Sequence, residues 1–139
     1  MFAGAKTGMH VVIACPAGYE PDPQVVEMAK EDAKATNAII EVMSDISAAT
    51  KDADVLYSDV WTSMGQEAEA AERLSVLAPY QVNAELLKLA KPDAIWMHCL
   101  PAHRGEEVTE DIMEGPQSVI FDQAENRMHA QKAVLASVI

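Results

Sequence analysis

Cysteines, aromatic residues and long apolar stretches are scarce in this sequence. Only Cys15 and Cys99 are cysteines among 139 residues, which is too few for a disulfide framework and fits a reducing compartment. No apolar run approaches the roughly 18 residues that a membrane-spanning helix needs. The opening residues also lack the apolar core of a signal peptide. We therefore expect a cytoplasmic protein with no membrane partner.

Basic residues are few as well, and several well-known ligand-binding motifs are missing. Ten Lys and Arg stand against 22 Asp and Glu, and the resulting charge of −12 disfavours nucleic acid as a partner. The sequence contains no G-x-G-x-x-G after an apolar run, no P-loop and no G-x-S-x-G motif. These absences argue against a nucleoside triphosphatase and a serine hydrolase. Dinucleotide binding is then supported only by the general similarity of the expected fold to dinucleotide-binding domains.

Five short apolar runs alternate with segments of helical pattern. Each run is rich in β-branched or aromatic residues and nearly continuously apolar, which is typical of a strand covered on both faces. The alternation predicts an α/β fold in one domain over residues 1–139. We expect a Rossmann-like three-layer sandwich, with a mostly parallel sheet wound by helices on both faces. The expected strands are residues 10–14, 38–42, 54–57, 94–97 and 118–121.

Capping residues and prolines mark the ends of the expected helices. Asp22 before Pro23 predicts an N-cap with proline at the first helical position. Residues 3–9 resemble the tail of a helix with no strand before it, so the first strand of the sheet is expected to be missing. The last helix should begin after Asp122 and bury the stripe formed by Ala130, Ala133, Val134 and Val138. The other expected helices are residues 23–36, 45–49, 66–77, 84–90 and 106–114.

The loop after the third expected strand carries the first candidate site. Ligands of open α/β sheets bind at the carboxyl ends of the strands, and residues 59–66 place an acid, two hydroxyls and a glycine there. Free N–H groups at the following helix favour an anion, while Asp59 favours a cation. An amino acid offers both charges. The alternative is that Asp59 and Ser63 only cap their own helix.

The loop after the fourth expected strand carries the second candidate. Cys99 is interpretable as a thiol of lowered pKa, as a hydrogen-bonding sulfur near a substrate, or as buried packing. A metal site of His98, Cys99 and His103 is disfavoured, because no second cluster completes the ligands that structural zinc requires. His98 is more typical of a core histidine. The Glu106–Glu107 pair is most simply a solvated helix face.

Arg127, near the start of the last helix, is the third candidate. A cation at a helix N-terminus opposes the helix dipole, which favours an anionic ligand or partner as the reason for its presence. The alternative is an arginine that pairs with Glu125 or is simply solvated. Cys15 ranks lower, since the turn that follows it looks rigid and favours a packing role.

Three stretches together are similar to the ornithine carbamoyltransferase family. They are residues 59–67 with the sequence DVWTSMGQE, residues 98–101 with HCLP, and residues 125–127 with ENR. The resemblance covers nearly the whole chain and is to the C-terminal, ornithine-binding lobe of that family, within the aspartate/ornithine carbamoyltransferase superfamily. It implies transfer of the carbamoyl group of carbamoyl phosphate to the δ-amino group of L-ornithine, a step of arginine biosynthesis. The products are L-citrulline and phosphate, and no cofactor and no metal are implied.

The resemblance also implies roles for particular residues. Asp59 would hold the amino end of ornithine, while Ser63 and the Met64 backbone would hold its carboxylate. Cys99 would lie beside the reacting amine, with Asp59 and Cys99 as the catalytic candidates. The Leu100 carbonyl would hold the carbamoyl NH₂ group, and Arg127 would bind an oxygen of carbamoyl phosphate.

The sequence departs from the family by what it does not contain. Family members have an S-T-R-T-R phosphate loop and an H-P-x-Q segment in an N-terminal lobe, and a G-D-x-N-N stretch that opens the second lobe; all three are missing here. The resemblance therefore implies a partial second lobe that is inactive alone, from a family that forms homotrimers or multiples of trimers. Two alternatives remain open: a fragment that binds an amino acid without catalysis, and a fragment that associates with itself through an open sheet edge.

Overall fold

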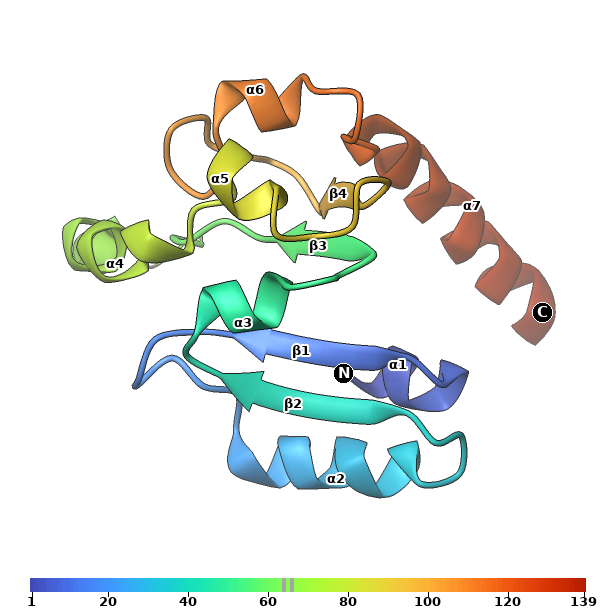
Figure 1. Ribbon diagram of the computed structural model, residues 1–139. Helices are drawn as coiled ribbons and strands as arrows, with labels where there is room; N and C mark the ends of the chain where they lie inside the picture. Colours follow the sequence, from blue (N-terminus) through green and yellow to red (C-terminus); the bar gives the residue numbers. More distant parts are fainter. Residues whose placement is uncertain (64, 66) are drawn as a thin grey trace. The chain divides into compact units, whose positions relative to one another are not determined.

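The computed structural model describes residues 1–63, 65 and 67–139, which form two compact units (Figure 1). The first unit is Met1–Ala49 and the second is Thr50–Ile139. Each unit is a mixed α/β structure that contains one pair of parallel strands and flanking helices. The predicted α/β class with parallel strands is confirmed.

The first unit consists of α1 (Phe2–Thr7), β1 (His10–Ala14), α2 (Pro23–Ala33) and β2 (Ile39–Met43). The two strands pair in parallel (Figure 1), from His10 beside Ile39 to Ala14 beside Met43. Asp22 caps α2 as predicted, because its Oδ1 accepts the Gln24 N–H at 2.7 Å. The helix ends before the expected residue 36, since the chain turns there and Asn37 adopts a left-handed φ of 59°.

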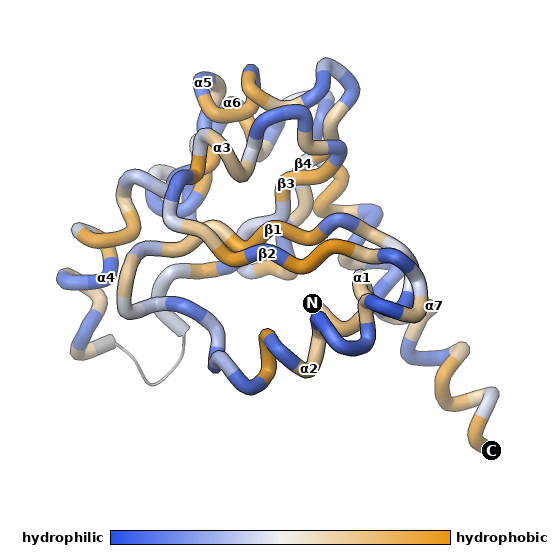
Figure 2. Tube along the Cα trace, turned by 60° about the horizontal axis from the view of Figure 1, so that its bottom comes forward, coloured by the Kyte–Doolittle hydropathy of each residue, from blue (hydrophilic) through white to orange (hydrophobic). Residues whose placement is uncertain are grey.

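Small side chains make up the core of the first unit. Ala5, Ala29 and Ala33 are buried against Ile40. Both strands are largely hydrophobic in Figure 2, and small residues on α1 and α2 allow the helices to approach them closely. At Gly4 the approach is so close that a Cβ atom would overlap Cγ2 of Val11.

The boundary between the units falls within α3 (Ile46–Thr50), and the second unit contains the strands β3 (Val55–Ser58) and β4 (Ile95–His98). They pair in parallel from Val55 beside Ile95 to Ser58 beside His98, so their carboxyl ends are neighbours. Both strands were predicted to within one residue. The remaining elements are η1 (Glu67–Glu69), α4 (Ala70–Leu77), η2 (Ala78–Tyr80), α5 (Ala84–Leu87), α6 (Glu110–Met113) and α7 (Ile120–Val138).

The fifth expected strand, residues 118–121, is not formed. Ser118 makes a single parallel bridge with Trp96, whose N–H donates to the Gln117 carbonyl at 2.8 Å. The backbone then turns into α7 at Ile120, which leaves no residues to extend the ladder. A short apolar run is compatible with either a strand or a buried helix start, and here the helix is found.

Two further expectations about helices are wrong. The helix expected at 106–114 is limited to α6, and Glu106 and Glu107 lie in the preceding turn. The stripe expected on α7 is exposed; only the first residue of that helix, Ile120, is buried. Apolar periodicity predicted the helix itself but not what covers it. The expected start of the 66–77 helix falls on Gln66, outside the described residues, whereas its end at Leu77 is confirmed.

The core of the second unit combines large apolar residues with buried polar ones. Trp96, Val108 and Ile120 are almost completely buried, and so are His98 and Glu107. The Trp96 indole N–H donates to the Ser58 hydroxyl at 3.0 Å, which satisfies a polar group that burial would otherwise leave without a partner. Among the helices of the described residues, none has both the length and the apolar character required to cross a membrane.

Candidate functional site

The loops after β3 and β4 bring two of the predicted site residues into contact. Asp59 directly follows β3, Cys99 directly follows β4, and the parallel register places the two strand ends side by side. The Cys99 thiol donates a hydrogen bond to Asp59 Oδ1 at 3.0 Å. The same oxygen accepts the Val60 N–H at 2.7 Å. Residues 40 positions apart in the sequence therefore form one polar pair at the carboxyl edge of the sheet.

Burial and Asp59 together raise the pKa of Cys99. Burial is the larger cause, followed by the hydrogen bond to Asp59 and the negative charge of that carboxylate. The thiol therefore keeps its proton at neutral pH and acts as a hydrogen-bond donor. The interpretation of Cys99 as a thiol of lowered pKa is wrong, and the geometry is that of a hydrogen-bonding sulfur.

A groove of about 450 Å³ opens beside Cys99 in the second unit. Arg127, near the start of α7, lines the same groove. Within the described part of the chain Arg127 forms no ion pair, so the alternative in which it pairs with Glu125 is not found: Glu125 Oε1 lies 3.4 Å from His129 Nε2 instead. The groove therefore combines a guanidinium group with the thiol. Its lining residues are Tyr57, Cys99, Gln123, Ala124, Asn126, Arg127 and Ala130.

A line of hydrogen bonds supports the wall of the groove. The His98 backbone N–H donates to Gln123 Oε1 at 2.9 Å, and Gln123 Nε2 donates to the Tyr57 hydroxyl at 3.0 Å. The nearby Tyr57 phenol opposes part of the rise in the pKa of the Cys99 thiol. Burial raises the pKa of Tyr57 itself, so the phenol is protonated and keeps a hydrogen to donate.

His98 ends β4, and Leu100 lies at the beginning of the loop that follows it. Leu100 adopts a left-handed φ of 56°, which costs energy in a residue with a branched side chain. Its N–H donates to His98 Nδ1 at 2.8 Å, and this bond holds the unusual conformation. His98 is completely buried, which confirms the core histidine, and burial lowers the pKa of its ring.

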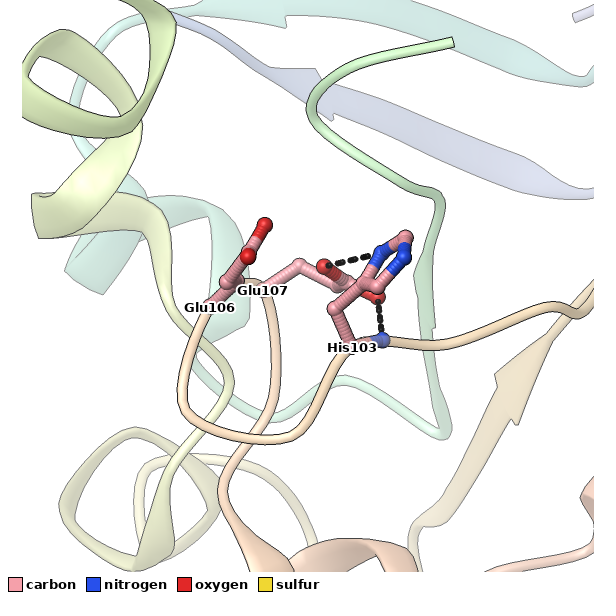
Figure 3. Close-up of side chains that lie close together, drawn as sticks. All are labelled: His103, Glu106 and Glu107. Atoms are coloured by element: carbon pink, nitrogen blue, oxygen red, sulfur yellow. Dashed lines mark hydrogen bonds and ion pairs between the residues drawn. The ribbon is translucent and has the colours of Figure 1, made fainter. Parts of the chain in front are cut away.

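The residues first considered as metal ligands are turned toward different partners. The His98 ring is bonded to Leu100, and the Cys99 thiol to Asp59. His103 lies with Glu106 and Glu107, whose donor atoms are all within 4.8 Å of one another (Figure 3). Glu107 already accepts the His103 N–H at 2.7 Å, so the turn in Figure 3 is held together by hydrogen bonds within the protein.

The Glu106–Glu107 pair corrects a second expectation. Glu107 is 0% exposed, although both glutamates were expected on a solvated helix face. Charge alone does not distinguish the two neighbours in the sequence. The turn reverses direction between them and buries the second side chain.

Comparison with known protein families identifies the family of the chain. The model of the aspartate/ornithine carbamoyltransferase Asp/Orn binding domain matches residues 1–138. The chain belongs to this carbamoyltransferase family. The match spans both units and includes the loops after β3 and β4 and all of α7.

Carbamoyltransferases from archaea are among the most similar proteins. The chain is 60% identical to ornithine carbamoyltransferase from Thermococcus kodakarensis and 58% identical to the anabolic ornithine carbamoyltransferase from Pyrococcus furiosus, each over all 139 residues. It spans 44% of the length of each of these relatives. The solved P. furiosus ornithine carbamoyltransferase covers 96% of this chain with a TM-score of 0.91 and 59% identity, and the chain covers 43% of it.

The remaining carbamoyltransferase residues named from the sequence are placed as follows. Ser63 is exposed in the loop after β3, and Met64 lies outside the described residues. Among the described residues, Asp59 Oδ1 accepts the Val60 N–H, and the N-cap position of α4 is occupied by Glu69, so Asp59 is not the cap of α4.

Sequence reasoning missed several residues that line the groove or support its wall. Tyr57 precedes Asp59 by two positions, and this spacing at a strand end was an available signal. Gln123 and Asn126 lie on the first turns of α7, where the last helix was predicted, but Arg127 alone was chosen there as a site residue because only its charge opposes the helix dipole. Nothing in the sequence marked Glu107 as a buried residue, because its burial depends on a turn that the sequence pattern does not reveal.

Proposed function

We propose that this chain is the ornithine-binding part of an ornithine carbamoyltransferase. Its relatives are named ornithine carbamoyltransferases, which supports ornithine as the substrate. The chain spans 44% of their length, which supports the proposal that it is only part of the enzyme. The complete enzyme would transfer a carbamoyl group from carbamoyl phosphate to L-ornithine, giving L-citrulline and phosphate. We expect these 139 residues alone to release no citrulline, because the phosphate loop of the family is not among them.

The contact between Asp59 and Cys99 carries this proposal. Their hydrogen bond of 3.0 Å places a carboxylate and a thiol at adjoining strand ends, and Arg127 lines the groove next to that thiol. A carboxylate favours the cationic amino end of ornithine, and a guanidinium favours the anionic oxygens of carbamoyl phosphate. In this proposal Ser63 and the Met64 backbone hold the ornithine carboxylate, and the Leu100 carbonyl holds the carbamoyl NH₂.

The chemistry requires that the δ-amino group first becomes neutral. Its lone pair then attacks the carbonyl carbon, a C–N bond forms, and the C–O bond to phosphate breaks with its electron pair leaving on phosphate. The amine proton has to pass to an acceptor near the site. Cys99 is protonated and donates to Asp59. We therefore assign proton acceptance to the Asp59 side of the pair and orientation of the amine to the sulfur, while Arg127 stabilises the departing negative charge.

We place the reaction in arginine biosynthesis in the cytoplasm, within an assembly of homotrimers. Sedimentation of the complete enzyme tests the assembly. For this chain alone, a sedimentation coefficient that rises with concentration would favour the self-associating fragment.

Substitution of Asp59 tests the function directly. In a polypeptide completed with the remaining part of the T. kodakarensis relative, Asp59→Asn is expected to lower kcat/KM for ornithine about 10- to 100-fold, because hydrogen bonds to charged groups contribute roughly 1.5–3 kcal/mol. The KM for carbamoyl phosphate should change little. Citrulline formation is the measurement.

Asp54→Asn is the matched control. Asp54 immediately precedes β3 and pairs with Lys91 at 2.5 Å on the surface, so its removal takes away the same charge far from the groove. The assignment of Asp59 to ornithine would be contradicted if Asp59→Asn lowered kcat/KM equally for both substrates, or if Asp54→Asn lowered it as much as Asp59→Asn. Calorimetric titration tests whether this chain binds norvaline. Norvaline binding together with a completed enzyme that forms no citrulline would favour a fragment that binds an amino acid without catalysis.

A further inference from the structure

The buried carboxyl group of Glu107 holds both ends of the loop that presents Cys99 and Leu100. At the far end its Oε1 accepts the His103 backbone N–H at 2.7 Å. At the near end the same oxygen lies 3.3 Å from Nε2 of His98. Both the His98 and the Glu107 side chains are 0% exposed, so this oxygen faces protein donors and not water. This one oxygen atom therefore contacts both ends of the segment 98–103.

The hydrogen bonds fix which nitrogen of His98 carries the proton. Nδ1 accepts the Leu100 N–H at 2.8 Å and therefore cannot itself bear a hydrogen. Burial favours the neutral ring, so the single proton resides on Nε2. Nε2 makes no hydrogen bond among the described residues, and the Glu107 oxygen 3.3 Å away is a charged neighbour that favours the proton on this nitrogen, which leaves Nδ1 free to accept.

The turn that carries Glu107 is itself anchored to its surroundings. The Glu107 carbonyl accepts the Val82 N–H at 2.9 Å, and the Val108 carbonyl accepts the Gly105 N–H at 2.8 Å. Gln81 Nε2 also donates to the Glu106 carbonyl at 2.7 Å. The oxygen that holds the loop therefore projects from a fixed turn, as a positioning group requires.

We propose that Glu107 is a positioning residue that acts through His98 to set the Leu100 backbone and the place of Cys99. The Glu107 oxygen lies 3.3 Å from the protonated Nε2 of the ring, the ring accepts the Leu100 N–H, and the left-handed Leu100 follows directly after Cys99. This inference rests on the proposed function for its effect on turnover. Its effect on the histidine ring does not depend on any activity.

Nitrogen NMR of His98 in this chain is the first test. We expect a neutral ring protonated on Nε2. Glu107→Leu removes the acceptor, and we expect loss of that tautomer preference. Glu107→Gln keeps an oxygen in place of Oε1, and we expect the preference to be retained. A ring protonated on Nδ1 in the unsubstituted chain would overturn the proposal even if Glu107→Leu does not fold.

Turnover of the completed enzyme is the second test. Supporting residues behind a functional group typically contribute 10- to 100-fold, and we expect a kcat loss of about that size in Glu107→Leu, with most of kcat retained in Glu107→Gln. Glu106→Leu is the control. It removes a glutamate side chain from the same turn but leaves the contacts of Glu107 with His98 and His103 in place. An unchanged kcat in Glu107→Leu, or equal losses in Glu106→Leu, would overturn the inference.

The alkylation ratio of Cys99 to Cys15 separates the two proposals from each other. Cys15 lies in the first unit and serves as an internal reference. Loss of the loop support in Glu107→Leu should free Cys99 from Asp59 and raise this ratio above that of Glu106→Leu. A raised ratio in an enzyme that never forms citrulline would contradict the proposed function and retain the positioning role, whereas an unchanged ratio would overturn the positioning role.

Discussion

The two units share one plan, a parallel strand pair with helices, but they bury different kinds of side chain. The first unit buries mainly alanines and Ile40. Its charged residues meet at the surface, as in the pair of Lys6 and Asp32 at 2.7 Å. The second unit buries Trp96 together with the polar groups of His98 and Glu107. The first core therefore depends on close approach of the backbone, and the second on directional contacts.

The difference indicates where the molecule can perform chemistry. Burial of a polar group is unfavourable unless a partner satisfies it, so buried polar groups persist where their directionality is used. In the second unit the partners of His98 and Glu107 lie in the loop that carries Cys99. We interpret the second unit as the site of the functional groups and the first as scaffold.

The largest expected effect tests the large side chains of the second core. Trp96→Ala should lower the free energy of unfolding by about 3–5 kcal/mol, because it opens a cavity and removes the indole that bonds Ser58. Urea denaturation followed by circular dichroism measures the change. Phe121→Ala, at a side chain 70% exposed on α7, is the control and should have little effect. Equal losses in the two variants would contradict the core assignment.

A smaller effect tests the close approach in the first core. Ala29 of α2 is 0% exposed, so Ala29→Leu adds volume to a filled core and should destabilise the chain by about 1–3 kcal/mol. The neighbouring Met28→Leu conserves volume at an exposed position and should change stability very little. Hydrogen exchange should report the loss of protection mainly in Met1–Ala49. Equal loss of protection in both units would remove the distinction between the two cores.

The smallest effect compares the two cysteines, one in each unit. Burial and Asp59 raise the pKa of Cys99, whereas burial and Glu20 raise the pKa of Cys15. A raised pKa means less thiolate and slower alkylation at a given pH. Asp59→Asn removes one cause for Cys99 alone, so its alkylation curve should move to lower pH while that of Cys15 stays in place. Iodoacetamide labelling read by mass spectrometry measures both curves. A shift of Cys99 to higher pH, or a common shift of both, would contradict the Asp59 contact.

Local signals predicted most of the elements and two of the site residues. Asp22 before Pro23 fixed the start of α2, because the cap uses only neighbouring backbone groups. Asp59 and Cys99 were predictable as neighbours, because both directly follow parallel strands whose carboxyl ends meet at one edge. In such cases the physical cause lies within a few residues of the signal, or in the regular geometry of the sheet.

What the sequence did not predict depends on tertiary contacts. Glu106 and Glu107 look alike in sequence, and only the turn decides that one is buried. The apolar residues of α7 predicted a buried face, yet Val134 and Val138 are exposed, since periodicity does not specify a partner. Residues 118–121 have strand character, but the helix begins within them.

The amide group of Gln123 gives the hydrogen bonds along the groove a single sense. Its oxygen is committed to the His98 backbone N–H, so its nitrogen has to donate to Tyr57, and the amide cannot turn over without losing both bonds. Successive donors that point one way polarise one another. Beside Tyr57 in the lining of the groove, the Cys99 thiol donates to Asp59. The sulfur, with its hydrogen directed to Asp59, presents only lone pairs to a visiting molecule, so this point of the groove accepts an N–H group and leaves donation to a carbonyl to other lining side chains such as Arg127.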